Sequence, residues 1–513
     1  MLSSLQSAGL VLISFASYLV FRFYVKRRRS PLPPGPRGLP LVGNLYDIPK
    51  RQEWLSFMEM SRIYDSDIIS LNLMGTTVIV LNSQAPVDAL LEERSIIYSD
   101  RPSFTILNKL VGFKWHFGFM SYGAEWKNHR KAFMQQFRPS EVLLHRPAEL
   151  EAARTLLQRL LESPVKYERH LRHMAGMVIL STTYGIDVEP EDDPYIDISE
   201  MAVHAMSCTI NGGSYLVDSL PFLRYVPGFF PGAGFQREAR EWSEVVSALR
   251  EIPYAFSKRV IATGTSKSSV ASRVLEEIGG SPQADDKEIV LKNILATCYA
   301  DTTVSALGTF ILAMTMYPDI QKKAQAAIEE VVGQGRLPDF DDKIPYIDAL
   351  VREVLRWRPV APLAIPHAVT KDDVYMGYHI PAGSVVIGNS WYWSRAILHD
   401  EATFGPNTKE FIPERWLTQD GKINLAMRDH GAVFGYGRRV CPGQDMAQWS
   451  IWICIVSILA TLDIRKCVDQ EGVPIEPSGE YIWGFLCYPV PHICEIVPRS
   501  EAARAMIRSA LQD

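Results

Sequence analysis

The sequence lacks several features that would each place it in a broad class of protein. Its seven cysteines include no Cys-x-x-Cys pair, so we expect neither a zinc site nor a disulfide framework, and a reducing compartment is favoured. Neither sign of charge dominates, because 53 basic and 58 acidic residues give a net charge of −5, which indicates no nucleic-acid partner. No nucleotide-binding or flavin motif is present. With 47% hydrophobic and 22% charged residues, the chain has the composition of a globular protein.

Long hydrophobic runs free of charge are also absent, with one exception at the N-terminus. Leu5 to Val25 is almost wholly apolar, and the basic cluster Lys26 to Arg29 follows it directly. About 20 apolar residues suffice to cross a bilayer as a helix. The basic residues follow the apolar run and no cleavage site of small residues is evident, so a transmembrane anchor over residues 1–29 is favoured over a cleaved signal peptide. The proline-rich stretch Ser30 to Pro40 predicts an extended hinge before a single cytoplasmic body, residues 41–513.

Helical periodicity dominates this body, and strand-like stretches are few. Asp285 or Asp286 is expected to cap the longest helix, and Pro318 to end it. Two polar stretches, residues 262–269 and 279–286, are predicted loops. The fold class is therefore mainly α with a minor β portion, in one large domain without internal repeats. The predicted helices are Gly123 to Phe137, Pro147 to Leu161, Arg237 to Ala262, Asp286 to Met316 and Pro345 to Trp357, and the predicted strand regions are Leu71 to Leu81 with a turn at Gly75, Asp373 to Val386, and Ile482 to Val497.

One cysteine lies in a run that few ordinary cores contain, the segment FGYGRRVCPGQ from Phe434 to Gln444. Gly437 and Gly443 permit tight turns on both sides of Cys441, and such turns can direct backbone N–H groups at its sulfur. Arg439 can neutralise an anionic group beside the same site. On composition alone, a buried cysteine in a glycine-rich turn would be the default interpretation.

The full pattern Phe434-x-x-Gly437-x-Arg439-x-Cys441-x-Gly443 resembles the heme-ligand loop of the cytochromes P450. The resemblance spans nearly the whole chain and is greatest to fungal membrane-bound members that tailor secondary metabolites, of the O-methylsterigmatocystin oxidoreductase type. It implies a single cytochrome P450-like domain that binds heme b (iron protoporphyrin IX), with Cys441 as the axial metal ligand. It further implies a set of cofactor-binding residues: Trp126 and Arg130 of a WxxxR helix, His367, Phe434, Arg439, Cys441 and Gly443.

The resemblance also implies a structural network and a catalytic pair. Glu353 and Arg356, at i,i+3 spacing on one helix face, would form a buried network with Arg415 of "FIPERW". Asp301 and Thr302 match an acid–alcohol pair that interrupts a helix and delivers protons. For His129, the interpretation as an ordinary helix-surface histidine is favoured over a ligand role.

Three departures from the family pattern stand out. Cys298 and Tyr299 replace residues that are usually small, so the tyrosine is expected to crowd the oxygen pocket or reshape the substrate wall. Tyr392 to Arg395 has the character of a four-residue insertion, for which the sequence offers no physical account. Trp416 replaces the usual phenylalanine.

The function implied is a heme-thiolate monooxygenase that oxidises a lipophilic secondary metabolite with O2. A terpenoid-like skeleton is favoured over a polyketide or an alkaloid. Electrons would come from NADPH through a membrane cytochrome P450 reductase, at the endoplasmic reticulum membrane, and Lys127, Arg130 and Lys131 are candidates for docking it. The substrate wall is expected from residues 104–120, 201–213, 293–302, 360–366 and 483–486, with candidate contacts at Phe117, Cys298, Tyr299, Leu363 and Phe485.

Three other functions remain as alternatives. Tyr299 raises the possibility of a heme-thiolate isomerase or dehydratase that needs no O2. A heme-binding protein without catalytic activity is the second, against which the intact Asp301, Thr302 and Cys441 argue. A cysteine hydrolase is the third, and it lacks a marked histidine partner.

Overall fold

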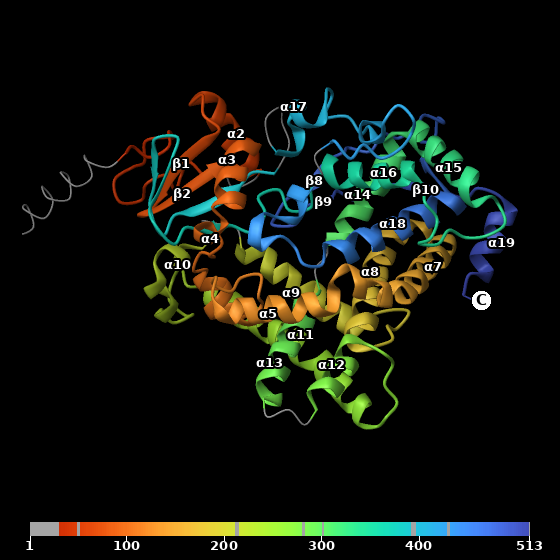
Figure 1. Ribbon diagram of the computed structural model, residues 1–513, viewed down its shortest axis with the longest axis horizontal. Coiled ribbons are helices and arrows are strands. Elements are labelled where there is room, and N and C mark those ends of the chain that lie inside the picture. Colours follow the sequence, from red (N-terminus) through yellow and green to blue (C-terminus); the bar gives the residue numbers. More distant parts are fainter. Residues whose placement is uncertain are drawn as a thin grey trace, which may run out of the picture.

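The computed structural model describes residues 30–48, 52–210, 215–279, 283–299, 302–390, 397–427 and 431–511. Most of these residues are helical, and a small four-stranded sheet lies at one end of the molecule (Figure 1). The predicted anchor, Leu5 to Val25, lies outside the described residues, as do Asp301 and the apparent insertion Tyr392 to Arg395. The mainly α fold class predicted from the sequence is confirmed.

Helices α7, α14, α15 and α16 pack around α18, the helix that follows Cys441. The described α-helices are α2 (Glu53–Ile63), α3 (Gln84–Val87), α4 (Ser95–Tyr98), α5 (Ala124–Phe137), α6 (Pro139–Val142), α7 (Arg146–Glu162), α8 (Tyr167–Tyr184), α9 (Pro194–Ile210), α10 (Leu216–Ser219), α11 (Phe235–Ala262), α12 (Val270–Ile278), α13 (Ala284–Thr297), α14 (Thr302–Met316), α15 (Pro318–Val332), α16 (Pro345–Trp357), α17 (Glu401–Phe404), α18 (Gln444–Thr461) and α19 (Glu501–Ser509).

The strands form one sheet of four and three pairs. The sheet has the order β1-β2-β6-β3, in which β2 and β6 are parallel and the other neighbours antiparallel, and the pairs are β4-β5, β7-β10 and β8-β9. The strands are β1 (Ile68–Leu73), β2 (Thr76–Leu81), β3 (His367–Ala368), β4 (Asp373–Tyr375), β5 (Tyr378–Ile380), β6 (Val385–Gly388), β7 (Leu462–Lys466), β8 (Tyr481–Ile482), β9 (Tyr488–Pro489) and β10 (Cys494–Pro498). The predicted hairpin with its turn at Gly75, whose φ is +98°, is confirmed.

Helices α5, α7, α11 and α16 confirm four of the five predicted helices, and α16 has the predicted bounds. The fifth was expected as one helix from Asp286 to Met316 and is instead divided into α13, which ends at Thr297, and α14, which begins at Thr302. The predicted cap was also wrong, because Gln283 occupies the N-cap position and both aspartates lie in the first turn of α13. There their negative charges favour the positive end of the helix dipole.

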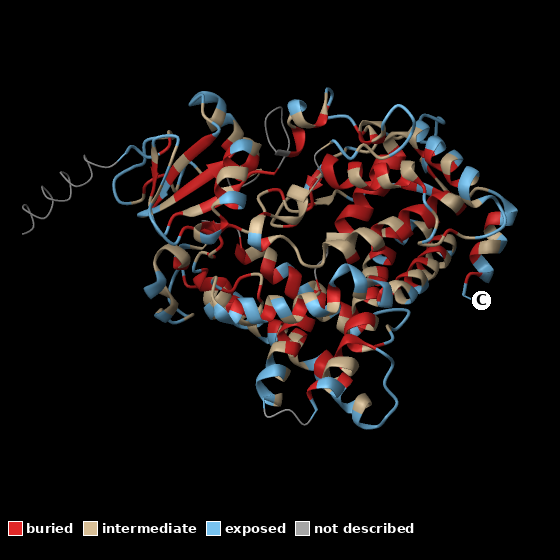
Figure 2. Ribbon diagram, viewed as in Figure 1, coloured by how far each residue is buried: buried red, intermediate tan, exposed pale blue. Residues whose placement is uncertain are grey.

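The hydrophobic core lies where α7, α14, α15 and α16 surround α18 (Figure 2). Residues of α14 from Val304 to Thr315 are buried without interruption, because this helix is apolar on every face. By length and composition the stretch from Ala284 to Met316 also passes as a membrane span, but 75% of its most apolar window is buried inside the protein. A core helix explains that composition.

The proline-rich hinge is extended, as predicted, but in its described part it is docked on the body. The carbonyl of Pro34 accepts a hydrogen bond from the backbone of Ser70 in β1, and that of Pro31 accepts one from His379 in β5. A Cβ atom on Gly35 would lie 2.0 Å from the Ser70 carbonyl oxygen, so only glycine allows this approach. These hinge residues are therefore packed against the body of the protein.

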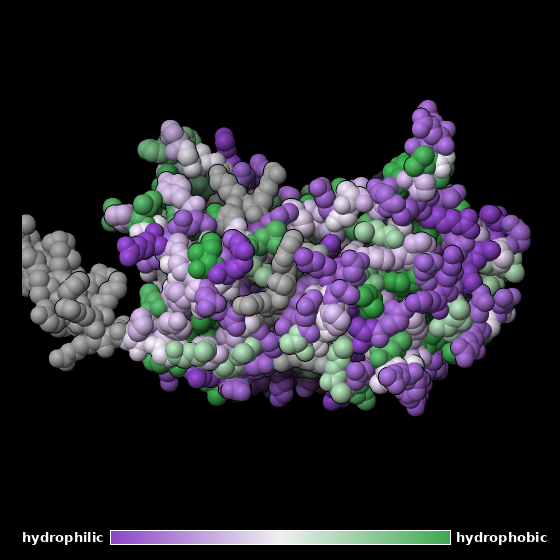
Figure 3. All heavy atoms as spheres, turned by 90° about the horizontal axis from the view of Figure 1, so that it is seen from above, coloured by the Kyte–Doolittle hydropathy of each residue, from purple (hydrophilic) through white to green (hydrophobic). Residues whose placement is uncertain are grey.

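The surface mixes hydrophobic and hydrophilic residues, as the view from above shows (Figure 3). Several large apolar side chains are exposed near the sheet end of the molecule and around α10, among them Leu39, Leu41, Phe222, Phe229 and Phe230. Helix α10 and the β1–β2 hairpin lie at the same end (Figure 1).

Candidate functional site

Cys441 lies between a single 3₁₀ turn, Gly437–Arg439, and the first residue of α18. Its backbone N–H donates to the carbonyl of Phe434 across 2.7 Å, which closes the loop. Gly437 has φ +54°, and a Cβ there would lie 2.2 Å from the Leu91 carbonyl oxygen, so this glycine is required. Gly443 lies in the turn before α18 and lines the cavity, with φ −99°, which other residues can also adopt.

The surroundings of the Cys441 sulfur act on its ionisation in opposite directions. Burial raises the pKa of the thiol above its ordinary value and the charge of Asp445 adds to the rise, whereas the Gly443 N–H, which hydrogen-bonds to the sulfur, and the positive charge of Arg130 act in the opposite direction. Cys298 lines the same cavity, but there burial and the neighbouring Cys441 both raise the thiol pKa, with no opposing group. Of the two cavity cysteines, Cys441 is thus the one equipped to become a thiolate ligand.

Arg130 and Trp126 lie on one face of α5, as the four-residue spacing predicts. The guanidinium of Arg130 donates to the Val440 carbonyl across 2.8 Å, and Trp126 lies between it and Arg439, whose guanidinium is 4.3 Å from the Trp126 ring. Arg439 is itself held by the carbonyls of Ser99 and Met120, each at 2.7 Å. All three side chains line the cavity that Cys441 faces.

His367 and a residue that the sequence analysis did not single out complete the basic side of the cavity. His367, on β3, donates Nδ1–H to the Tyr98 carbonyl across 2.7 Å, and burial together with Arg101 and Arg439 holds its pKa well below the ordinary value. Arg101 is 7% exposed and donates to the carbonyls of Gly118, Ile365 and Pro366. An isolated arginine before a proline carries no sequence signal for such a role.

Positive charge exceeds negative charge on this side of the cavity, where Asp100 attracts Arg101 and Arg439 without forming an ion pair with either. Among the described residues, none of Arg101, Arg130 and Arg439 forms an ion pair with a carboxylate, although all three are at least half buried. Uncompensated buried charges are costly. The site therefore fits a ligand that brings its own anionic groups.

The predicted network of Glu353, Arg356 and Arg415 is assembled behind the site. Arg356 makes a two-pronged contact with the Glu353 carboxylate at 2.7 and 2.8 Å, and Arg415 donates to it at 3.1 Å. Burial raises the pKa of Glu353, but both guanidiniums together outweigh it and hold the pKa below its ordinary value. Trp416, noted as a departure, donates its indole N–H to the same carboxylate across 2.9 Å.

Opposite Cys441 the cavity, about 290 Å3 in volume, is bounded mainly by apolar side chains. All five predicted substrate segments contribute to it, and Phe117, Cys298 and Phe485 are among the lining residues. Leu363 is not; it packs in the core near Trp54 and Leu71. Helix α8 supplies a further part of the wall that the sequence analysis missed, because its apolar residues have no pattern that separates a cavity from a core: Met174, Ala175, Val178 and Ile179.

Tyr299 also does not line the cavity, contrary to expectation. Its side chain is buried against α8, where a Cβ on Gly176 would lie 3.3 Å from the phenol oxygen and 2.7 Å from Ile196. Gly176 thus provides the space that the tyrosine needs. The predicted crowding of the oxygen pocket was wrong. Thr302, the first residue of α14, does line the cavity, together with Thr303.

Two predictions for α5 were also wrong. His129 is 3% exposed and not a surface residue; its Nδ1 contacts the Glu125 carbonyl, and Nε2 lies 3.0 Å from the Asn293 amide of α13. Arg130 points inward to Val440, so it does not belong to an exposed docking cluster with Lys127 and Lys131.

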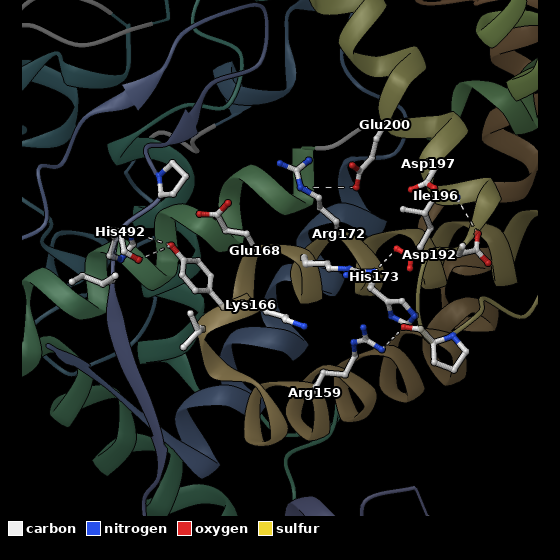
Figure 4. A pocket seen from close by; sticks show the side chains of 17 residues that line it. Arg159, Lys166, Glu168, Arg172, His173, Asp192, Ile196, Asp197, Glu200 and His492 are labelled. Carbon is white, nitrogen blue, oxygen red and sulfur yellow. Dashed lines mark hydrogen bonds and ion pairs between the residues drawn. The ribbon is translucent and has the colours of Figure 1, made fainter.

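A second hollow, about 600 Å3 in volume, opens between the N-terminal parts of α8 and α9 and the segment before β10 (Figure 4). Its charged side chains largely neutralise one another, as in the pairs Arg169–Asp192 and Arg159–Glu191. It contains neither cysteine nor an apolar wall, so the cavity at Cys441 remains the candidate site.

The groups around Cys441 fit heme and not a bare metal ion. Within the described residues, no three His, Cys, Asp or Glu side chains are grouped so that they could hold a metal. A single thiol suits an iron atom whose other ligands belong to a macrocycle. The three unpaired guanidiniums and His367 suit the two carboxylates of the same group.

Comparison with known proteins agrees with this geometry. A family model described as Cytochrome P450 matches residues 33–495. Cytochrome P450 monooxygenase 98 of Postia placenta is 42% identical, over 97% of this chain and 97% of its own length. Tryptamine 4-monooxygenase of Psilocybe cyanescens is 39% identical, over 92% of this chain and 94% of its own. Together with the cysteine loop and its basic cavity, these matches show that the chain belongs to the cytochrome P450 family, whose members use heme with a cysteine thiolate as axial ligand.

Proposed function

We propose that this chain is a monooxygenase that oxidises a lipophilic secondary metabolite with O2. The observation that carries the proposal is the position of Cys441, a thiol with thiolate-favouring neighbours, at the floor of a cavity whose other wall is apolar. Bound through that thiolate, heme supplies oxygen activation, because the electron density of the sulfur favours O–O cleavage.

The side chains of this chain divide the remaining tasks between them. Arg101, Arg130 and Arg439, which line the cavity with Cys441, would hold the carboxylates of the cofactor. The apolar wall excludes water and binds the substrate by hydrophobic contact. The Thr302 hydroxyl lies at the cavity, where we propose that it holds and passes a proton, with Asp301 as its neighbour in sequence.

The substrate is proposed to be uncharged and terpenoid-like, with a polyketide or an alkaloid as the alternatives. The tryptamine 4-monooxygenase of Psilocybe cyanescens bears a name that points to an alkaloid-type substrate, which supports the last of these. The apolar wall, with Phe117 and Phe485, supports a hydrophobic skeleton of any of the three kinds. Product analysis after co-expression with a reductase and a panel of candidate metabolites distinguishes them.

Electrons are proposed to come from NADPH through a membrane-bound reductase, at the endoplasmic reticulum, where residues 1–29 anchor the chain. The exposed side chains of Leu41, Phe222 and Phe229 support a membrane-facing end. Exposed apolar patches of this kind mark interaction surfaces. A chain truncated before Ser30 is expected to bind phospholipid vesicles weakly, and further replacement of the three exposed residues by serine is expected to abolish that binding in a flotation assay.

The decisive experiment is the absorption spectrum of the purified, reduced protein with carbon monoxide. We expect the band of a thiolate-ligated heme from the natural sequence and from Cys298→Ala, and its loss from Cys441→Ala. A band typical of a nitrogen ligand in the natural sequence, or an unchanged band in Cys441→Ala, would contradict the proposal. Turnover without O2 or NADPH would indicate the isomerase or dehydratase alternative. That alternative was raised because Tyr299 was expected near the oxygen pocket, and the position of its phenol beside Gly176 of α8 does not support it.

A further inference from the structure

His116 lines the cavity beside its basic side, since Arg101 donates to the carbonyl of nearby Gly118, and the His116 ring is held on both sides. It stacks on Phe119, with ring centroids 4.7 Å apart and planes inclined by 28°. A Cβ on Gly118 would lie 2.9 Å from His116 Cε1 and 3.0 Å from Nδ1, so the backbone of Gly118 packs against the edge of the ring that carries these two atoms. The ring lies deep in the protein but keeps accessible surface, because it lines the cavity.

The hydrogen bonds of His116 determine which of its nitrogen atoms carries the proton. The backbone N–H of Gly118 donates to Nδ1 across 3.2 Å. Nδ1 is therefore an acceptor, and in the neutral ring the proton must be on Nε2. Burial lowers the pKa of His116 to about 4, so the ring is neutral at physiological pH. The result is one N–H donor, Nε2–H, that has no partner among the described residues.

Two other small polar groups that line the cavity already donate within their own helix. The Thr297 hydroxyl donates to the Asn293 carbonyl across 2.8 Å, and the Cys298 thiol to the Ile294 carbonyl across 3.3 Å. Nε2 of His116 is not one of the polar atoms buried without a partner, so its N–H is available to an acceptor on a molecule bound in the cavity.

We propose that His116 is a specificity-determining residue whose Nε2–H donates to an oxygen atom of the substrate. The substrate class is then an uncharged, largely hydrocarbon molecule that carries a carbonyl, ether or hydroxyl oxygen at one end. Cys298 and Thr302 line the same cavity, so an oxygen held at residues 116–119 would fix how the rest of the skeleton lies within it. This inference rests on the proposed function, because it concerns the substrate of that same cavity.

The test compares two probes with the same rigid skeleton, 9-fluorenone and fluorene, which differ by the ketone oxygen. Each is titrated into the purified heme-loaded protein, and the dissociation constant is measured from the change in the heme absorption spectrum. His116→Phe keeps an aromatic ring against Phe119 without a donor, and His116→Gln keeps an N–H donor. We expect the preference for fluorenone over fluorene to fall about 5- to 10-fold in His116→Phe, the worth of one neutral hydrogen bond. His116→Gln is expected to retain most of it.

Each other outcome overturns the inference. An unchanged preference in His116→Phe shows that the imidazole does not bind the ketone. Loss of heme from His116→Phe with the same preference in the loaded fraction shows that His116 holds the cofactor instead. If neither probe alters the spectrum of the natural sequence, the proposed substrate class is wrong, whereas a thiolate-type carbon monoxide band would still support the proposed function.

Discussion

The guanidinium of Arg130 donates a hydrogen bond to the Val440 carbonyl across 2.8 Å, which ties α5 to the residue directly before Cys441. The two residues are 310 positions apart in the sequence. Arg130 thus acts on the site in two ways, because its charge also lowers the pKa of the Cys441 thiol. The WxxxR pattern on α5 and the cysteine loop are one structural unit.

Replacement of Arg130 by methionine is expected to weaken heme binding by about 10- to 150-fold. The variant loses a charge-assisted hydrogen bond, worth about 1.5 to 3 kcal/mol, at the position where the cofactor carboxylates are expected. Lys131→Met, on the exposed side of the same helix, removes a charge without that contact and serves as the control. The ratio of heme absorbance to protein absorbance after dialysis measures the difference. Equal heme retention in both variants would contradict the assigned role of Arg130.

Contacts that are close in sequence could be predicted from local patterns, whereas contacts between distant segments could be predicted only where a family motif marks both partners, as for Glu353 and Arg415. The bounds of α16, the turn at Gly75 and the pairing of Glu353 with Arg356 follow from local patterns of spacing and turn residues. Arg101 and His116 were not identified, because their roles depend on partners and on a cavity that only the folded chain brings together.

Burial of polar side chains was the least predictable property. His129 has the sequence context of a surface histidine, but Asn293, which lies 164 residues away, gives its Nε2 a partner and so allows burial. Tyr299 occupies a position where a small residue was expected, and Gly176 on α8 makes room for it. In both cases a compensating residue on another helix determines the outcome, and no local pattern contains that information.

That compensation can be tested by adding one methyl group at Gly176. A Cβ there would lie 2.7 and 2.8 Å from two side-chain atoms of Ile196 and 3.3 Å from the Tyr299 oxygen. Although alanine favours a helix over glycine, we expect Gly176→Ala to lower the free energy of unfolding by about 1 to 3 kcal/mol through overpacking. Gly234→Ala, where a Cβ would meet nothing within 4 Å, is expected to have little effect. Denaturant unfolding measures both variants.

A double variant shows whether Ile196 is the side chain that the methyl group added at Gly176 meets. If Ile196 is the main obstacle, Gly176→Ala combined with Ile196→Ala is expected to cost less than the sum of the two single changes. Strict additivity would show that the added methyl group and Ile196 do not compete for the same space.

The bond from Trp416 to Glu353 is predicted to be worth more than an ordinary indole hydrogen bond. Trp416 and Trp357 are both 1% exposed, and their indole N–H groups donate at 2.9 and 2.8 Å, the first to the Glu353 carboxylate and the second to the Lys409 carbonyl. Bonds to charged groups contribute about 1.5 to 3 kcal/mol and neutral ones about 1 kcal/mol. We therefore expect Trp416→Phe to destabilise the protein more than Trp357→Phe in matched unfolding experiments. The reverse order would show that the indole is not a significant partner of the carboxylate.

Glu149 makes the stability of the protein depend on pH. It lies on α7, is 1% exposed, and accepts a hydrogen bond from Ser450 of α18 across 2.8 Å. Burial raises the pKa of its carboxyl from 4.5 to about 7, because neither the Ser450 hydroxyl nor the more distant Arg146 charge compensates for the loss of water. The folded state therefore binds this proton more tightly than the unfolded state.

As the pH rises from about 4.5 through about 7, the free energy of unfolding is expected to fall relative to that of a variant without this carboxyl. The total loss is about 3 kcal/mol once the pH is above the folded-state pKa. Glu149→Gln keeps the acceptor for Ser450 and removes the ionisable group, so its advantage over the natural sequence should be absent at pH 4.5 and largest at pH 8. Glu151→Gln, on an exposed turn of the same helix, controls for the change of net charge. Denaturant unfolding at intervals of pH measures the difference. If the difference in unfolding free energy between Glu149→Gln and the natural sequence is the same from pH 4.5 to 8, the pKa of Glu149 is not raised in the folded state.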